Sequence, residues 1–320
     1  MRQTGGNLQT WYNYKSLQGL RIRKSCLSLT SLPLGCFPVL KILNIYDCPN
    51  LKSISMLDDG STQNLSCLET LDLSFCPNLE SLPQGGLRTP NLSCLSISSC
   101  EKLVSCPQGG LPPNLRSLEI KISPMAIGEW GFQLLTFLSW CKISGDELVN
   151  ALLNAPLLPT SLVSLTIYDV NNLEILDGSG IQHLSSLEEL HMYKVKSLEL
   201  LQVDRLPPSL KKLEIRSCPL LKFLGGRGIH HLSSFEEIHL YKCKSLESLP
   251  EDRLPPSLKR LSISYCPLLE ESYHGQRRKY WSKIAHIPAI QINENVIISV
   301  IALYSGSVII RLTSTPLKIF

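Results

Sequence analysis

Paired carboxylates and nearby histidines are the residues of this chain best suited to acid–base or metal chemistry. Glu188-Glu189 and Glu236-Glu237 are adjacent carboxylates, and His230-His231 and His239 lie close to the second pair. Neighbouring carboxylates can act as acid and base, and His with Glu can ligate a metal. Each pair, however, precedes an aliphatic residue of a repeated segment, at positions expected to face solvent, and no Cys or carboxylate cluster completes a metal set. We therefore interpret them as a solvated face and expect no metal site.

The twelve cysteines could form disulfides, a zinc site or a thiol nucleophile. Their spacing contains no CxxC pair and no CxxC…H pattern, and neither a Ser-His-Asp nor a Cys-His arrangement can be argued. The N-terminus, MRQTGGNLQTWYNYK, lacks the apolar region of a secretory signal, which favours reduced thiols in the cytoplasm. Half of the cysteines recur at one position of a repeat, where we expect small residues turned inward: Cys48, Cys76, Cys100, Cys218, Cys243 and Cys266.

Composition and missing motifs exclude several classes of function. The chain has 320 residues, of which 43% are hydrophobic and 18% charged, which is too apolar for a disordered protein. A net charge of +4 gives no electrostatic argument for nucleic acid or an anionic membrane. No G-x-x-x-x-G-K-[ST] motif occurs, and the glycines of Gly225-Gly-Arg-Gly228 lie between repeats rather than between a strand and a helix. We predict that the chain is not an enzyme and holds no cofactor.

An internal repeat carries all of these residues. It reads Leu-x-x-Leu-x-Ile, with some exchange among aliphatic residues, and the copies begin at Leu40, Leu68, Leu92, Leu115, Leu162, Leu187, Leu210, Phe235 and Leu258. A worn copy begins at Leu17. A weak copy fits at Leu135, Leu138 and Trp140, and this register places Cys141 on the open face. The spacing is that of leucine-rich repeats.

A longer unit shows that neighbouring repeats were duplicated together. HLSSLEELHMYKVKSLELL at 183 returns as HLSSFEEIHLYKCKSLESL at 231, and RLPPSLKKLEIRSCPLL at 205 returns as RLPPSLKRLSISYCPLL at 253. Both shifts equal 48 residues. The duplication explains why His231 and His239 have counterparts in His183 and His191.

The repeats predict an α/β leucine-rich repeat solenoid. Alternation at Leu-x-Ile suits a short strand, and such strands stack in parallel at ~4.8 Å into a curved sheet. Prolines in the return segments, as in Leu206-Pro-Pro208, disfavour helices there. We expect a curved horseshoe with the parallel sheet on its concave face and a mostly irregular convex side. The expected organisation is a lead-in at 1–16, the solenoid with a C-terminal capping segment at 17–292, and an apolar tail at 293–320.

The repeats and their ending resemble the leucine-rich repeat region of plant intracellular disease-resistance proteins, the coiled-coil type of nucleotide-binding immune receptors. The resemblance rests on Leu-x-x-Leu-x-Ile-x-x-Cys-Pro-x-Leu copies joined by Leu-Pro-Pro-Ser-Leu. It also rests on the closing segment Trp281-Ser-Lys-Ile284-Ala-His286-Ile287-Pro288-Ala-Ile290, and it covers residues 15 to 292. The family's coiled coil and nucleotide-binding module have no counterpart here, so we expect a fragment, a truncated relative or a relic.

The resemblance implies a recognition module that reads a pathogen effector or a guarded host protein. In a full-length parent it would also hold a nucleotide switch off, and ATP or ADP would bind only the parent's nucleotide-binding module. The alternative is the substrate receptor of a ubiquitin ligase, since leucine-rich repeats serve there too. Neither interpretation includes nucleic acid as a partner.

The repeat register indicates which side chains would contact a protein partner. The residues after each strand's second aliphatic, and those one step earlier, should face the open side of the sheet. Tyr and Arg are enriched at interface hot spots, although Tyr also favours strands. The predicted protein-binding residues on the concave face are Tyr46, Tyr168, His191, Tyr193, Glu214, Arg216, His239 and Tyr241.

The tail departs from the family pattern. Its longest apolar run, Val296 to Ile310, has 15 residues, fewer than the ~20 that cross a bilayer, so a membrane span is not favoured. Translated non-coding sequence, an extra capping strand and a membrane-touching segment stay open as explanations.

Overall fold

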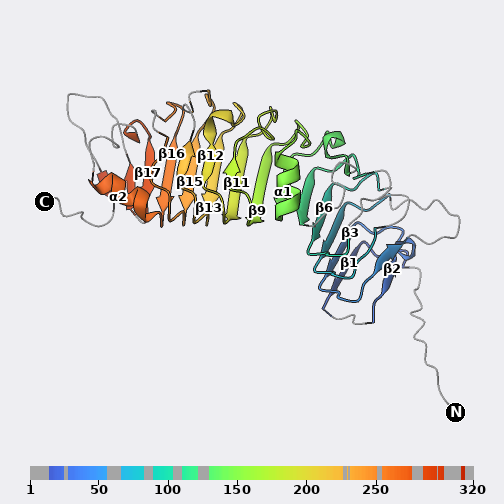
Figure 1. Ribbon diagram of the computed structural model, residues 1–320. Coiled ribbons are helices and arrows are strands. Elements are labelled where there is room, and N and C mark those ends of the chain that lie inside the picture. The colour runs from blue at the N-terminus through green and yellow to red at the C-terminus, as the bar shows by residue number, and fades with distance from the viewer. Residues whose placement is uncertain are drawn as a thin grey trace, which may run out of the picture. The chain divides into compact units, whose positions relative to one another are not determined.

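The computed structural model describes residues 14–24, 28–55, 66–82, 89–103, 110–121, 130–225, 229, 231–250, 254–275, 284–293, 295–298 and 311–313. They fall into two compact units, Met1–Gly131 and Phe132–Phe320, which we describe separately (Figure 1).

Unit 1 is built around a parallel sheet with one strand per repeat. Its strands are β1 (Gly19–Arg23), β3 (Ile42–Tyr46), β5 (Thr70–Ser74), β6 (Cys94–Ser98) and β7 (Ser117–Lys121), paired in that order. The return segments hold the parallel pair β2 (Ser31–Pro33) and β4 (Ser53–Ser55), and the 3-10 turn η1 (Leu34–Cys36). The worn copy at Leu17 is thus a true repeat, because its strand β1 pairs in register with β3.

Unit 2 has the same pattern of one strand per repeat. Its main sheet contains β8 (Trp140–Ser144), β9 (Ser164–Val170), β11 (Glu189–Val195), β13 (Lys212–Arg216), β15 (Glu237–Tyr241), β16 (Arg260–Ser264) and β17 (Ala289–Ile292), all parallel. The return segments hold the parallel sheet of β10 (Ile175–Leu176), β12 (Leu200–Gln202) and β14 (Phe223–Gly225), the 3-10 turns η3 (Phe132–Leu134) and η4 (Val203–Arg205), and the helices α1 (Asp146–Leu153) and α2 (Pro267–Gly275).

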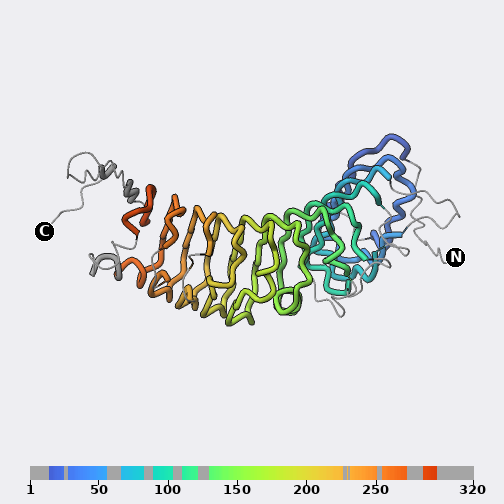
Figure 2. Tube along the Cα trace, turned by 90° about the horizontal axis from the view of Figure 1, so that it is seen from above, coloured from blue at the N-terminus to red at the C-terminus, as the bar shows by residue number. Residues whose placement is uncertain are grey.

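Figure 2 shows the chain winding through unit 2 as successive coils, one for each repeat. The predicted leucine-rich repeat solenoid is confirmed: parallel strands on one side, and mostly turns and short extended segments on the other.

Alternation along each strand builds the core. In β13, Leu213 and Ile215 are 1% and 0% exposed, and their counterparts from β3 to β16 are buried in the same way, whereas those of β1 at the sheet edge are half-buried. Since the side-chain period of a strand is two, the residues between them must point to the opposite face. That opposite face of the main sheet is called the strand face below.

Side chains on the return path tie each coil to the one before it. The Ser209 hydroxyl donates to the Leu187 carbonyl at 2.7 Å, and Ser257 donates to Phe235 at 2.8 Å. The Nε2 atoms of His183 and His231 lie 2.8 Å and 3.0 Å from carbonyl oxygens of the preceding coil. These histidines hold backbone groups together, which is a structural role.

The weak copy at Leu135 was placed in the wrong register. Cys141 pairs with Leu165, and Ile143 pairs with Ile167, so the strand begins three residues later than we predicted. Cys141 is 0% exposed and faces the core, not the open side. A cysteine occupies the first inward position of this strand, and as a small hydrophobe it packs there in place of the usual leucine.

The closing segment forms a further repeat. β17 pairs in parallel with β16, with Ile290 beside Leu261 and Ile292 beside Ile263. Ile284 and Ile287 are both fully buried. Residues 281–283, which include Trp281, lie outside the described residues.

Two tail segments extend the edge of this sheet. β18 (Asn295–Ile298) pairs antiparallel with β17, and β19 (Arg311–Thr313) pairs antiparallel with β18. This arrangement agrees with the capping-strand alternative for these two segments. Among the described residues, no helix is both long and apolar enough to cross a membrane.

The repeated cysteines are buried and unbridged. All six that recur at the repeat position face the core, and the ten described cysteines are free thiols. Cys218 donates to the Arg216 carbonyl at 3.6 Å, and Cys243 donates to Tyr241 at 3.7 Å. Burial raises the pKa of Cys218 to about 12. The thiols therefore pack as small hydrophobes, as predicted.

One left-handed residue follows the strand in most repeats, which the sequence did not indicate. The residues with positive φ other than glycine are Lys24, Asp47, Phe75, Ser99, Asp169, Lys194, Ser217, Lys242, Tyr265 and Asn293. At Ser99, φ is 53° and the amide donates to the Lys121 carbonyl of the next repeat at 3.1 Å. The same bond recurs from Ser217 to Tyr241 at 2.8 Å. In these described repeats, a strained backbone conformation is combined with a hydrogen bond between neighbouring coils.

We expect Ser99→Gly to be neutral or to raise the free energy of unfolding by up to about 1 kcal/mol, because glycine adopts positive φ without strain. Ser99→Val should lower it by about 1–2 kcal/mol, because β-branched residues tolerate this conformation poorly. Urea unfolding measures both. Ser96, half-buried within β6, is the control: glycine there should destabilise by about 0.5–1 kcal/mol. Equal effects of glycine at the two positions would contradict this explanation.

The buried thiols should react slowly. Brief alkylation at about pH 8 should label the half-buried Cys67 and Cys94 at least a hundredfold faster than Cys218 or Cys243, because little thiolate forms when the pKa is high. Mass mapping of the labelled chain measures this ratio. Equal labelling, or a disulfide at Cys218 or Cys243, would show that these thiols do not fill the inner turn.

Candidate functional site

A hollow on the strand face of unit 2 gathers most of the predicted binding residues. It has a volume of about 520 Å³ and lies over β9, β11, β13 and β15. Its lining residues are Tyr168, His191, Tyr193, Lys194, Lys212, Glu214, Arg216, Ser217 and Tyr241. We call it the strand-face hollow.

Strand register brings the side chains together. Within the sheet, His191 pairs with Glu214 and Glu214 with His239, while Tyr193 pairs with Arg216 and Arg216 with Tyr241. His191, Glu214 and His239 lie between two buried aliphatics, and Tyr193, Arg216 and Tyr241 follow the second of them. Two ladders of polar and aromatic side chains therefore run across neighbouring strands, one step of the pleat apart.

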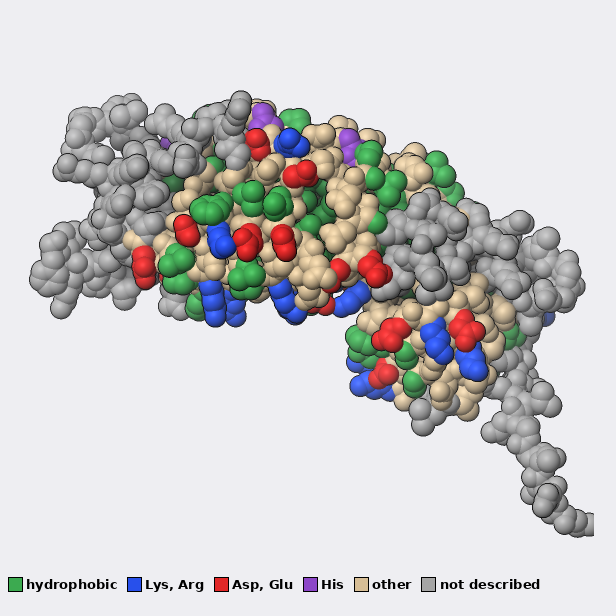
Figure 3. Space-filling model, in the orientation of Figure 1, with side chains coloured by type: hydrophobic (Ala, Val, Ile, Leu, Met, Phe, Trp, Pro, Cys, Tyr) green, Lys and Arg blue, Asp and Glu red, His purple; other side chains and the backbone are tan. Residues whose placement is uncertain are grey.

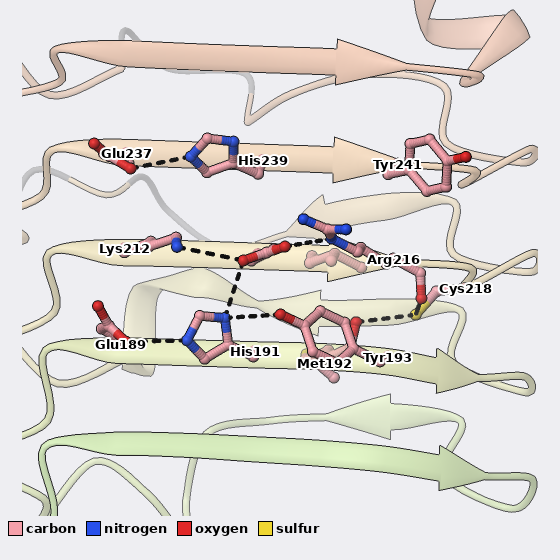
Figure 4. A network of polar contacts seen from close by, with 12 residues as sticks. Glu189, His191, Met192, Tyr193, Lys212, Arg216, Cys218, Glu237, His239 and Tyr241 are labelled. Atoms are coloured by element: carbon pink, nitrogen blue, oxygen red, sulfur yellow. Dashed lines mark hydrogen bonds and ion pairs between the residues drawn. The ribbon is translucent and has the colours of Figure 1, made fainter. Parts of the chain in front are cut away.

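Glu214 is the centre of the polar network, and Figure 4 labels its partners His191, Lys212 and Arg216. Its side chain is buried, with 4% of the residue exposed, and it contacts Lys212 at 3.4 Å, His191 Nδ1 at 3.1 Å and the Nε of Arg216. Burial opposes ionisation of the carboxyl, but the charges of Arg216, Lys212 and His191 outweigh it, so the pKa of Glu214 is lowered. An ionised carboxylate is thus held beneath the surface by cationic neighbours on two strands.

His191 bridges two carboxylates. Its Nδ1 lies 3.1 Å from Glu214, and its Nε2 lies 3.1 Å from Glu189 on the same strand. A carboxylate only accepts hydrogen bonds, so a ring nitrogen that bonds Glu214 or Glu189 acts as the donor. The Tyr193 hydroxyl lies 3.2 Å from the same Nδ1. Burial, followed by the charge of Glu214, raises the pKa of Tyr193 to about 12.

Cations lie over the tyrosine rings. The Arg216 guanidinium carbon is 5.7 Å from the centre of the Tyr193 ring and 6.0 Å from that of Tyr241. The Lys194 amine is 5.2 Å from the centre of the Tyr168 ring, and it donates to that residue's hydroxyl at 3.0 Å. These distances suit cation–π attraction, which fixes both the rings and the charges.

Two of the eight predicted residues lie apart from the strand-face hollow. His239 contacts Glu237 at 3.0 Å on its own strand and does not line the hollow. Tyr46 belongs to unit 1, where the Arg23 guanidinium carbon is 5.0 Å from its ring centre and the Phe75 ring is 5.2 Å away.

The structure adds three lining residues that the repeat register alone did not select: Lys194, Lys212 and Ser217. Lys212 lies two residues before Glu214, so the strand period could have placed it on the same face. Lys194, near the end of β11, and Ser217, directly after β13, have the left-handed backbone conformation, and nothing in the sequence pattern indicated it.

The paired carboxylates are engaged in ion pairs. Glu188 contacts Lys211 at 2.7 Å and Glu236 contacts Lys259 at 2.7 Å, while Glu189 and Glu237 contact histidines. In the part of the chain that the structure describes, no three or more His, Cys, Asp or Glu side chains are grouped to hold a metal ion. The arrangement suits contact with another molecule through rings and charges.

Glu214→Gln should lower the free energy of unfolding by about 1–3 kcal/mol at pH 7, because it leaves Arg216, Lys212 and His191 together without their shared counter-charge. The folded pKa of Glu214 is below its unfolded value of about 4.3, so its ionised form contributes stability above that pH. This contribution is lost as the pH falls through the folded pKa. The variant should therefore show a smaller loss of stability between pH 5 and the acid limit.

Chemical unfolding at several pH values measures the effect, and Glu199→Gln is the matched control. Glu199 forms an exposed ion pair with Lys222 at 2.9 Å, so its removal should change stability by less than about 0.5 kcal/mol. If the two substitutions changed the free energy of unfolding equally at every pH, the buried network around Glu214 would contribute no more than an exposed ion pair.

Comparisons with known proteins support the resemblance drawn from the repeats. No protein-family model matches the chain. "Putative disease resistance protein At3g14460" of Arabidopsis thaliana is 35% identical over 223 residues, covering 61% of this chain and 15% of that protein. "Putative disease resistance RPP13-like protein 1" of the same plant is 33% identical over 81 residues, covering 25% of this chain and 8% of that protein.

A solved leucine-rich repeat domain, that of the type III effector XopL, is 24% identical, with a TM-score of 0.47 and coverage of 79% of this chain and 78% of that one. The chain spans only a small part of the curated relatives that it matches. The observed solenoid is a leucine-rich repeat fold, and the chain is similar in sequence to plant disease-resistance proteins.

Proposed function

We propose that this chain is the protein-recognition module of a plant disease-resistance receptor, and that it reads a pathogen effector or a guarded host protein through the strand face of unit 2. The observation that carries the proposal is the strand-face hollow, where Tyr168, Tyr193, Tyr241 and Arg216 are held by neighbouring charges.

Preorganisation is what makes this face suited to recognition. Tyrosine rings offer large contact area with few rotatable bonds, and each has a hydroxyl that can bond a partner. Here the cations over the rings and the buried Glu214 already fix their positions, so little side-chain entropy remains to be lost on binding. A stabilising role alone would not require rings and charges at an open surface.

In a full-length parent, the same module would act in the cytoplasm and restrain the nucleotide switch until a partner is bound. ATP or ADP would bind the parent's nucleotide-binding module, not this chain. The expected partners are therefore the effector or guarded protein and, within the parent, the nucleotide-binding module. None of the relatives described above bears the name of a ubiquitin-ligase subunit, so nothing in these comparisons favours that alternative.

Replacing Tyr193, Arg216 and Tyr241 together with Ala should leave the solenoid folded, because all three side chains are at least partly exposed and Glu214 keeps its contacts with Lys212 and His191. The response to a partner should fall at least tenfold, because the rings and the guanidinium provide the contact. The measurement places the repeats in a complete receptor and scores cell death in leaves that express a library of pathogen effectors. Each active effector is then tested against the variant.

The matched control replaces Glu199 and Lys222, an exposed ion pair on the return path, with Ala. Ser209 and Ser257 are less suitable controls, because both hydroxyls bond the backbone of the preceding coil. If the triple variant and the control gave an equal cell-death response, the recognition surface would not lie on the strand face.

A further inference from the structure

The strand-face hollow has an excess of positive charge. Its lining contains Lys194, Lys212 and Arg216, against the single carboxylate of Glu214. One negative charge against three positive ones leaves an excess of two, before His191 is counted. Glu214 is itself buried beneath this surface, so a molecule approaching from solvent meets the cations first.

The other acidic groups nearby lie outside the lining or are already engaged. Glu189 contacts His191 at 3.1 Å, and Glu237 contacts His239 at 3.0 Å, both at the amino ends of their strands. Asp169 lies beside Lys194 at the rim and tempers its charge. Arg216, Lys194 and the tyrosine rings lie instead near the carboxyl ends of their strands, whereas Lys212 begins β13 and pairs in register with Glu189 and Glu237. Figure 3 shows Lys and Arg side chains along one border of the unit 2 sheet.

Arg216 is placed to receive a carboxylate. Its Nε contacts Glu214, which fixes the plane of the guanidinium, and the rings of Tyr193 and Tyr241 flank it. Its side chain is 54% exposed. A guanidinium has five N–H donors, so the bond from Nε leaves the terminal nitrogens able to make paired bonds to a carboxylate.

We propose, building on the recognition function above, that the strand-face hollow binds an acidic segment of a protein partner, with an Asp or Glu side chain on the terminal nitrogens of Arg216. Lys194 and Lys212 attract the same segment, and the rings of Tyr193 and Tyr241 pack against its neighbouring residues. Charge complementarity selects the acidic segment over a neutral or basic one.

The test uses the full chain and a fluorescein-labelled peptide, Gly-Glu-Asp-Glu-Gly, with Gly-Gln-Asn-Gln-Gly as the neutral comparison. Fluorescence polarisation should show saturable binding of the acidic peptide at about 50 mM salt, weakened severalfold at about 300 mM because screening acts on exposed charges. The neutral peptide should bind at least about tenfold more weakly, because it lacks the charge-assisted bonds.

Two variants locate the site. Arg216→Gln should weaken binding of the acidic peptide at least about tenfold. Lys194→Gln, whose side chain does not contact Glu214, should weaken it severalfold without disturbing the buried network. Arg205→Gln is the matched control, because Arg205 is 53% exposed and forms one ion pair, with Asp177, on the return path. It should bind like the original chain.

Equal binding of the acidic and neutral peptides, or equal loss in the Arg205 and Arg216 variants, would overturn the inference. Absence of saturable binding at low salt would also overturn it. None of these results would contradict the recognition function, since the alanine variants in the complete receptor test that function with whole effectors. Loss of the effector response in those variants together with absence of peptide binding would mean that the surface recognises a different chemistry.

Discussion

In-register stacking of parallel strands is the constraint on which the rest of this structure depends. Each strand contributes two aliphatic side chains that point inward, such as Leu213 and Ile215. These side chains are buried only when the strand of the next coil pairs in register with their own strand. The requirement repeats at each coil, so the register of every strand is fixed by its neighbours. The outward-facing residues of successive strands are then aligned in columns, and this alignment needs no interaction between their side chains. The strand-face hollow is a consequence of that geometry.

The left-handed turn maintains the register at the end of each strand. A residue with φ near 55° turns the chain inward and directs its amide to the carbonyl of the next strand, as at Ser217. The cysteine that follows, such as Cys218, then enters the core. A strained residue at each coil costs free energy, but it supplies a bond between coils that a relaxed backbone would not make at that place. The same turn projects Lys194 toward Tyr168. A structural device of the repeat thus also shapes the candidate site.

Most of the fold could be predicted from the sequence, because the aliphatic pattern reports the core directly. The predicted register was wrong at Cys141, because a cysteine occupies the position where the other repeats have an aliphatic residue. For the site, the outward columns were predictable, and six of the eight predicted residues line one hollow. The burial of Glu214 could not be predicted, because the pattern indicates which face of the sheet a residue occupies but not which cations cover its side chain. Lys194 was missed for a related reason: its position depends on a backbone conformation, which no residue type specified.

The duplicated unit explains why the polar network forms only once among the described strands. His191 and Tyr193 on β11 have counterparts in His239 and Tyr241 on β15. On the following strands, however, Glu214 and Arg216 correspond to Ser262 and Ser264. His191 therefore meets a carboxylate on the next strand, whereas His239 meets a serine and contacts only Glu237 among the carboxylates described here. Two substitutions after the duplication thus separate the Glu214–Arg216 network from a copy of the same scaffold in which serines take both places. In this solenoid, where the core fixes every backbone position, the recognition chemistry depends on the few outward residues that are free to differ between repeats.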